Sequence, residues 1–171
     1  MLFNRIAGVF RLSIATFEDI EHDPRATGQA ALVVGIVALL AAIGSGFGAL
    51  FTEGGFFSTF LYALVWTYIS WILVSLVVYI VGTAFFHGTA DFYEMLRVIG
   101  FAYAPQMLAI IPCVGGIIGA IWSLVAGFIA VRQGLDIDDL RSLFTIVAGF
   151  ALYLIGVVLI NVFFGIFGIF T

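Results

Sequence analysis

The side chains of this sequence that come closest to a metal-ligand set are two His–Asp groups. They are His22, Asp23, His87 and Asp91. Paired metal ligands on one helix lie three or four residues apart. His22 and Asp23 are adjacent, and His87 and Asp91, although four residues apart, fall in a predicted turn and at a helix cap rather than on one helix. We therefore interpret all four as solvated loop residues, and the sequence predicts no metal site.

Three acidic residues, Asp136, Asp138 and Asp139, resemble part of a calcium loop. The Gly and Glu that would complete such a loop do not follow them. The only cysteine, Cys113, can form neither an internal disulfide nor a thiolate metal site. No Ser, Cys or His is arranged for nucleophilic catalysis, and no glycine loop cradles a phosphate. We therefore expect no enzyme activity and no cofactor.

The most specific interior feature is the run Tyr103-Ala-Pro105-Gln106. Pro105 has no amide hydrogen to donate, and it disrupts the preceding helical turn. In lipid, the freed carbonyl groups must find new partners, for which the Tyr103 hydroxyl and the Gln106 amide are candidates. A kink here would either shape an inner cavity or simply set helix packing.

A charged pair precedes that run. Glu94 and Arg97 lie three residues apart on a helix start and can pair, while Asp91 and Glu94 match a capping box. Two roles remain open for Arg97. It either anchors its helix or contacts a lipid phosphate.

The elements that would position these residues are apolar helices. The chain of 171 residues is 64% hydrophobic and 9% charged, which is typical of an integral membrane protein. Five transmembrane helices are predicted, over about 27–51, 57–86, 92–111, 117–133 and 142–164. The third and fourth share a run without charge that is too long for one crossing, and Pro112 marks the turn between them. A re-entrant pair of helices over 92–133 is the alternative to two full spans.

Residues 1–25 form a separate segment before this bundle of residues 26–171. Its apolar positions recur every three or four residues, which predicts an amphipathic helix or helix pair on the cytoplasmic leaflet. Near the end of the first span, the run from Gly44 to Gly48 offers small residues that permit close helix contact.

The positive charges fix an orientation for this plan. The chain has six Arg and no Lys, and every Arg falls on one side of the five predicted spans. Cytoplasmic loops are enriched in such residues, so the N-terminus is predicted inside and the C-terminus outside. Nine of the ten acidic residues share that side, which leaves no basic stripe for nucleic acid.

Several segments resemble a known family. The run Phe17-Glu-Asp-Ile20 with Asp23-Pro24, the run Gly100-Phe-Ala-Tyr103-Ala-Pro105, and the stretch from Trp122 to Asp136 are similar to bacterial Yip-type (Yip-one domain) proteins. The resemblance implies a five-span bundle with a cytoplasmic N-terminus. Eukaryotic members bind Rab-type GTPases in the ER and Golgi. This chain lacks their long N-terminal region and their Asp-Leu-Tyr-Gly-Pro stretch, so GTPase binding is doubtful and a prokaryotic inner membrane is favoured over an ER or Golgi membrane.

Two functions follow as hypotheses. The spans carry no charged side chain at membrane depth, which argues against a coupled pump. The first hypothesis is a non-enzymatic membrane organiser or accessory subunit, with membrane lipids, other membrane proteins or a second copy as partners. The alternative is a lipid-handling or passive transport protein with a cavity near Pro105 and Arg97. The candidate lipid or helix-packing residues are Arg97, Tyr103, Pro105, Gln106, Gly44 and Gly48.

Overall fold

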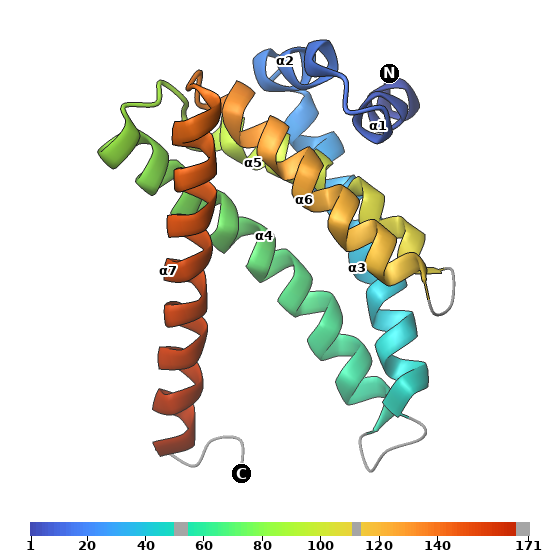
Figure 1. Ribbon diagram of the computed structural model, residues 1–171. Helices are drawn as coiled ribbons and strands as arrows, with labels where there is room; N and C mark the ends of the chain where they lie inside the picture. The colour runs from blue at the N-terminus through green and yellow to red at the C-terminus, as the bar shows by residue number, and fades with distance from the viewer. Residues whose placement is uncertain (50–54, 111–113, 167–171) are drawn as a thin grey trace.

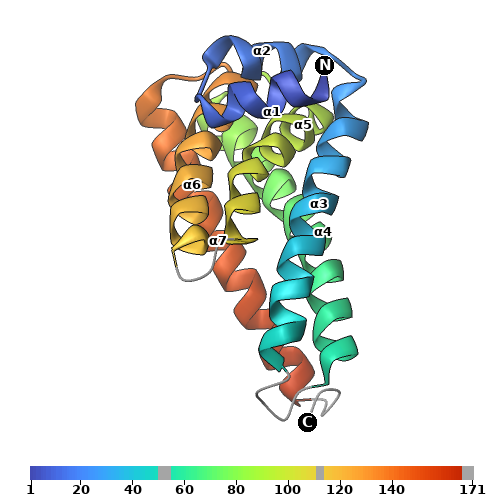
Figure 2. The ribbon, with the colours of Figure 1, turned by 90° about the vertical axis from the view of Figure 1, so that its right-hand side faces the viewer.

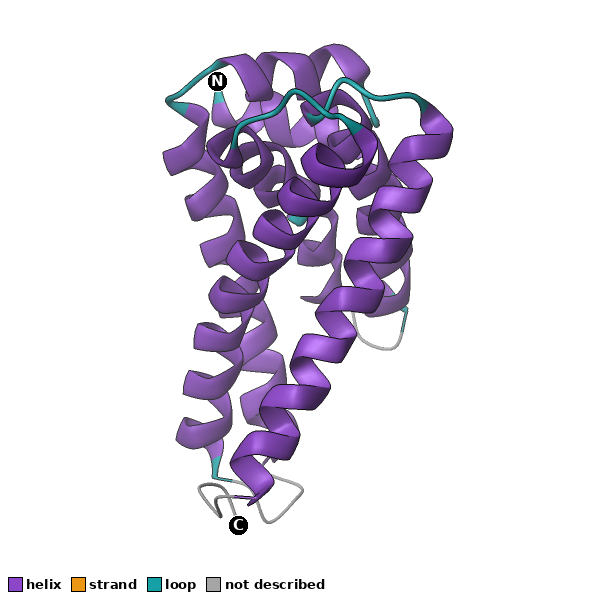
Figure 3. Ribbon diagram, turned by 90° about the vertical axis from the view of Figure 1, so that its left-hand side faces the viewer, coloured by secondary structure: helices purple, strands orange, loops and turns teal. Residues whose placement is uncertain are grey.

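The computed structural model describes residues 1–49, 55–110 and 114–166, and the regular structure within these ranges is entirely helical (Figures 1 and 3). The elements are α1 (Leu2–Phe10), α2 (Ile14–His22), α3 (Ala26–Ala49), α4 (Phe56–Phe86), α5 (Phe92–Ala102), the 3-10 helix η1 (Ala104–Ile110), α6 (Gly115–Gly134) and α7 (Asp139–Ile166). Pro112 and Cys113, in the predicted turn, lie outside the described residues.

Four helices in the described residues are long and apolar enough to cross a membrane, and the prediction of five was wrong. They are Ala26–Gly44 of α3, the whole of α4, the whole of α6, and Asp139–Gly156 of α7. These windows lie within or close to four of the ranges expected from the sequence.

The predicted third span, 92–111, is broken into α5 and η1. At 1.5 Å per residue the 11 residues of α5 extend only about 16 Å, too short for a bilayer core. Pro105 is the physical reason, because it has no amide hydrogen for the carbonyl of Phe101 one turn earlier. The chain continues through Tyr103 into η1 rather than as an α-helix. Figures 1 and 2 place the end of η1 and the start of α6 part-way along α3 and α4.

One end of the molecule gathers its charged segments. In Figure 1, α1, α2, the first turns of α5 and α7 and the last turn of α6 all lie at the top, whereas α7 ends at the bottom. Ion pairs join neighbouring elements at the top end, including Arg5 with Asp19 at 2.7 Å and Arg132 with Asp139 at 2.8 Å.

The amphipathic segment forms two short helices that lie across this charged end (Figure 2). Arg5 of α1 holds them in place, because its guanidinium donates to Asp19 and Asp23 of the α2 region and to Gln29 of α3. Val9 and Phe17 are fully buried, so part of the apolar face that we assigned to the membrane interface packs on the bundle instead. Phe3 remains 82% exposed.

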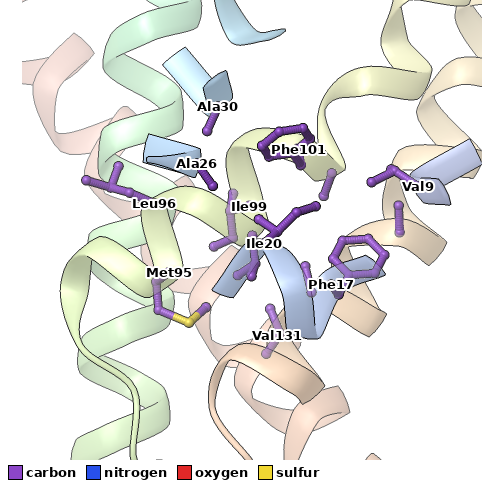
Figure 4. Close-up of a cluster of buried hydrophobic side chains, with 14 of the residues drawn as sticks. Val9, Phe17, Ile20, Ala26, Ala30, Met95, Leu96, Ile99, Phe101 and Val131 are labelled. Atoms are coloured by element: carbon purple, nitrogen blue, oxygen red, sulfur yellow. The ribbon is translucent and has the colours of Figure 1, made fainter. Parts of the chain in front are cut away.

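The core lies where these two helices meet α3, α5 and α6. Figure 4 shows Phe17 and Ile20 of α2 beside Ile99 and Phe101 of α5, with Val131 of α6 close by. This cluster fixes α5 in the middle of the molecule, and α5 in turn sets the position of Tyr103 and η1.

Candidate functional site

A cavity of about 520 Å³ lies between α4, the α5–η1 segment, α6 and α7, and we call it the central cavity. Its wall is predominantly apolar with a few polar groups, which is the usual make-up of a small-molecule site. The lining residues are Val74, Val78, Ile99, Ala102, Tyr103, Gln106, Ala120, Ser123, Leu124, Gly127, Val131, Ile146, Gly149, Phe150 and Tyr153.

The rim of the central cavity lies on α6 and α7. Leu124 of α6 is 70% exposed and Phe150 of α7 is 60% exposed, although both line the cavity. Both helices are candidate membrane spans. This exposed part of the lining therefore faces sideways, toward the space that acyl chains fill in a bilayer.

Two of the predicted residues, Tyr103 and Gln106, line this cavity. Pro105 between them is buried and sets the approach of η1 to α6. A side-chain carbon on Gly119 would lie only 2.7 Å from the Pro105 carbonyl oxygen, so the two backbones touch only because residue 119 is glycine. The helix break, where the sequence predicted a kink, therefore forms one wall of the cavity.

Arg97 lies elsewhere. Its guanidinium donates to the backbone carbonyl of Glu21, with Nε at 2.9 Å, and pairs with Glu94 at 3.8 Å as the spacing predicted. The predicted capping box of Asp91 and Glu94 is also present at the start of α5. Arg97 thus fastens α5 to α2 at the charged end, and it does not line the central cavity.

The carboxyl group of Glu21 shares this charged end. Burial raises its pKa to about 7, and the nearby Asp136 carboxylate adds to the rise. Its ionisation thus falls in the physiological range, at the contact of α2 with α5 and the α6–α7 loop.

The two predicted glycines behave differently from the cavity residues. A side-chain carbon on Gly44 would meet nothing within 4 Å among the described residues, so Gly44 is not used for a close helix contact there. Gly48 belongs to α3, but its surroundings lie outside what the structure describes.

Sequence reasoning missed the α6 and α7 contributions to the site. Ser123 and Gly127 lie four residues apart on α6, as do Gly149 and Tyr153 on α7. Residues at this spacing share one helix face. Small and polar residues repeated at that interval were the available signal, but it does not reveal which faces meet.

The fold and the cavity define a helical integral membrane protein with a largely apolar internal cavity. The model of the Yip1 domain matches residues 7–161, nearly the whole chain, so the protein belongs to the Yip1 domain family. The comparisons with curated proteins and with solved structures found no match.

Proposed function

We propose that this Yip1 domain protein is a non-enzymatic, lipid-handling membrane protein that binds a lipid chain in the central cavity. The observation that carries this proposal is the apolar central cavity, whose lining includes the exposed side chains of Leu124 on α6 and Phe150 on α7. Of the two hypotheses drawn from the sequence, this cavity favours the lipid-handling protein over the membrane organiser or accessory subunit. A wall of apolar side chains on spanning helices suits an acyl chain that enters from the bilayer.

The proposal includes an orientation. The elements that carry all six Arg meet at one end of the bundle, and such an end is cytoplasmic by the positive-inside rule. The C-terminal end of α7 would then lie outside. We favour the inner membrane of a prokaryote as the location.

A pair of matched glycine substitutions tests the lipid-binding proposal. A side-chain carbon at Gly127 of α6 or at Gly156 of α7 would meet nothing within 4 Å, but only Gly127 lines the cavity. Gly127→Leu should fill the cavity, and Gly156→Leu should add the same bulk outside it. We expect native mass spectrometry of the purified protein to detect retained lipid on the wild type and on Gly156→Leu, but not on Gly127→Leu. Equal lipid retention by all three proteins would contradict the proposal.

A second candidate, the accessory subunit of a larger assembly, is favoured by Gly44. Among the described residues, the open space at Gly44 leaves room on α3 for the close approach of a helix of another chain. Purification from native membranes in a mild polymer tests this, because a stoichiometric partner protein lost from Gly44→Leu would support it. Recovery of the wild type without any protein partner would count against it.

A further inference from the structure

The wall of the central cavity carries no charge. Its fifteen lining residues, all within the described part of the chain, include no Arg, Lys, His, Asp or Glu. Arg97, the residue that the sequence suggested for a lipid phosphate, already binds the Glu21 carbonyl and Glu94. A phosphate placed in this cavity would therefore lose its hydration without gaining an opposite charge, which is costly at membrane depth.

The wall nevertheless offers hydrogen bonds. The Ser123 hydroxyl is buried and has no hydrogen-bond partner among the described residues. The side-chain amide of Gln106 likewise makes no hydrogen bond to another described group. By contrast, the hydroxyl of Tyr153 lies 3.3 Å from that of Ser70. Because no bulk water reaches a bilayer core, the unpaired groups of Gln106 and Ser123 favour a ligand that pairs with them.

Gln106 and Ser123 lie on the same part of the wall. A side-chain carbon on Gly119 would lie 3.2 Å from the Cα atom of Gln106. Ser123 follows Gly119 by one helical turn and shares its face of α6. The close approach of η1 to α6 thus brings two polar groups together beside an otherwise apolar space.

From this arrangement we propose that the central cavity selects a neutral lipid, one whose polar end is an uncharged hydroxyl or ester group rather than a phosphate. The inference rests on the proposed lipid-binding function and names its ligand class. The apolar chain occupies the space between α6 and α7, and the uncharged polar end pairs with Gln106 and Ser123.

Two lipids with identical acyl chains but different headgroups show how the headgroup alone affects binding. Purified protein is titrated with dioleoylglycerol and with dioleoyl phosphatidate, and bound lipid is counted by native mass spectrometry. We expect dioleoylglycerol to bind about fivefold more tightly or better, which is the effect of one or more hydrogen bonds. Gln106→Leu, of similar size, should weaken dioleoylglycerol binding more than phosphatidate binding and so abolish this preference.

Control variants distinguish a failure of the proposed ligand class from a failure of the proposed lipid-binding function. Ser123→Ala should weaken dioleoylglycerol binding to a smaller extent, and it serves as the second variant if Gln106→Leu does not yield folded protein. Equal binding of the two lipids, or a preference for phosphatidate, would overturn the ligand class and leave lipid binding intact. Undiminished binding of both lipids to Gly127→Leu would instead overturn the proposed function.

Discussion

The two sides of this bundle are packed in opposite ways. Between α3, α4 and α5 the helices touch closely: a side-chain carbon on Gly100 would lie 2.8 Å from the Cβ atom of Ala30. Two polar side chains there are paired, since the indole of Trp71 donates to the Leu96 carbonyl at 3.1 Å and the Tyr68 hydroxyl to the Ala31 carbonyl at 3.1 Å. The buried hydroxyl of Ser75 on α4 has no partner among the described residues. The helices on this side are therefore closely packed against one another.

The side formed by α6 and α7 is open. Within the membrane-span windows, 17% of α7 is buried against 39% of α3, and the central cavity lies beside α7. Its polar residues Gln106 and Ser123 keep unused hydrogen-bonding groups among the described residues. The contrast teaches that the tight side positions η1, and that the open side is where a ligand has room.

The largest predicted loss of stability comes from a substitution on the tightly packed side, between α3 and α5. Gly100→Ala forces its new methyl group against Ala30, which cannot rotate away, so we expect a loss of about 1–3 kcal/mol in unfolding free energy. Gly127→Ala is the matched change on the open side, where a methyl group meets nothing within 4 Å. It should leave stability unchanged or raise it by up to about 1 kcal/mol, since Ala favours helix over Gly. Thermal unfolding in detergent measures both, and equal destabilisation would refute the contrast.

Hydrogen bonding on the tight side gives the next effect. Trp71→Phe removes the donor to the Leu96 carbonyl and part of the buried ring, and we expect a cost of about 1–2 kcal/mol. Trp122→Phe is the comparison, because its indole donates to the Phe10 carbonyl from an exposed position on α6. That variant should unfold almost like the wild type. A larger loss of unfolding free energy from Trp122→Phe than from Trp71→Phe would contradict the view that the side formed by α3, α4 and α5 is the more tightly packed one.

The charged end predicts a pH dependence. Because the folded-state pKa of Glu21 is raised from 4.5 to about 7, the folded protein binds this proton more tightly than the unfolded chain does. Stability from Glu21 should therefore fall as pH rises from about 4.5 through 7, by at most about 3 kcal/mol. The raised pKa of His22, caused first by its hydrogen bond to the Glu18 carbonyl, acts in the same direction.

Glu21→Gln isolates the carboxyl group from His22. Unfolding midpoints measured between pH 5 and pH 8 should fall less steeply for this variant than for the wild type. Parallel curves for the two proteins would show that Glu21 does not titrate in this range.

The long apolar helices and the local side-chain pairs could be predicted from the sequence, because both depend on neighbours along the chain. The capping box of Asp91 and Glu94 is such a case. The end of α5 before Pro105 could not be predicted from the sequence, because a proline in an apolar run is compatible with a kinked span as well as with the observed helix end. Only the buried contacts of α5 with α2 and α3 decide between them.

The candidate site was predicted in part for the same reason. Tyr103 and Gln106 belong to the local run around Pro105 and were found. The partner of Arg97 is a backbone carbonyl 76 residues away, at Glu21, and no local pattern indicates it. Ser123 and Tyr153 enter the site only because α7 leaves room beside α6, which depends on the packing of the whole bundle.

The most direct test of the central claim is photolabelling in liposomes with a diacylglycerol that carries a photoreactive group in its acyl chain. The account predicts saturable labelling of cavity residues on α6 and α7, such as Ser123 and Tyr153, that unlabelled diacylglycerol displaces. Gly127→Leu should lose this labelling and Gly156→Leu should keep it. Labelling confined to lipid-facing positions such as Ile155, without saturation and unchanged in Gly127→Leu, would contradict a lipid site between α6 and α7.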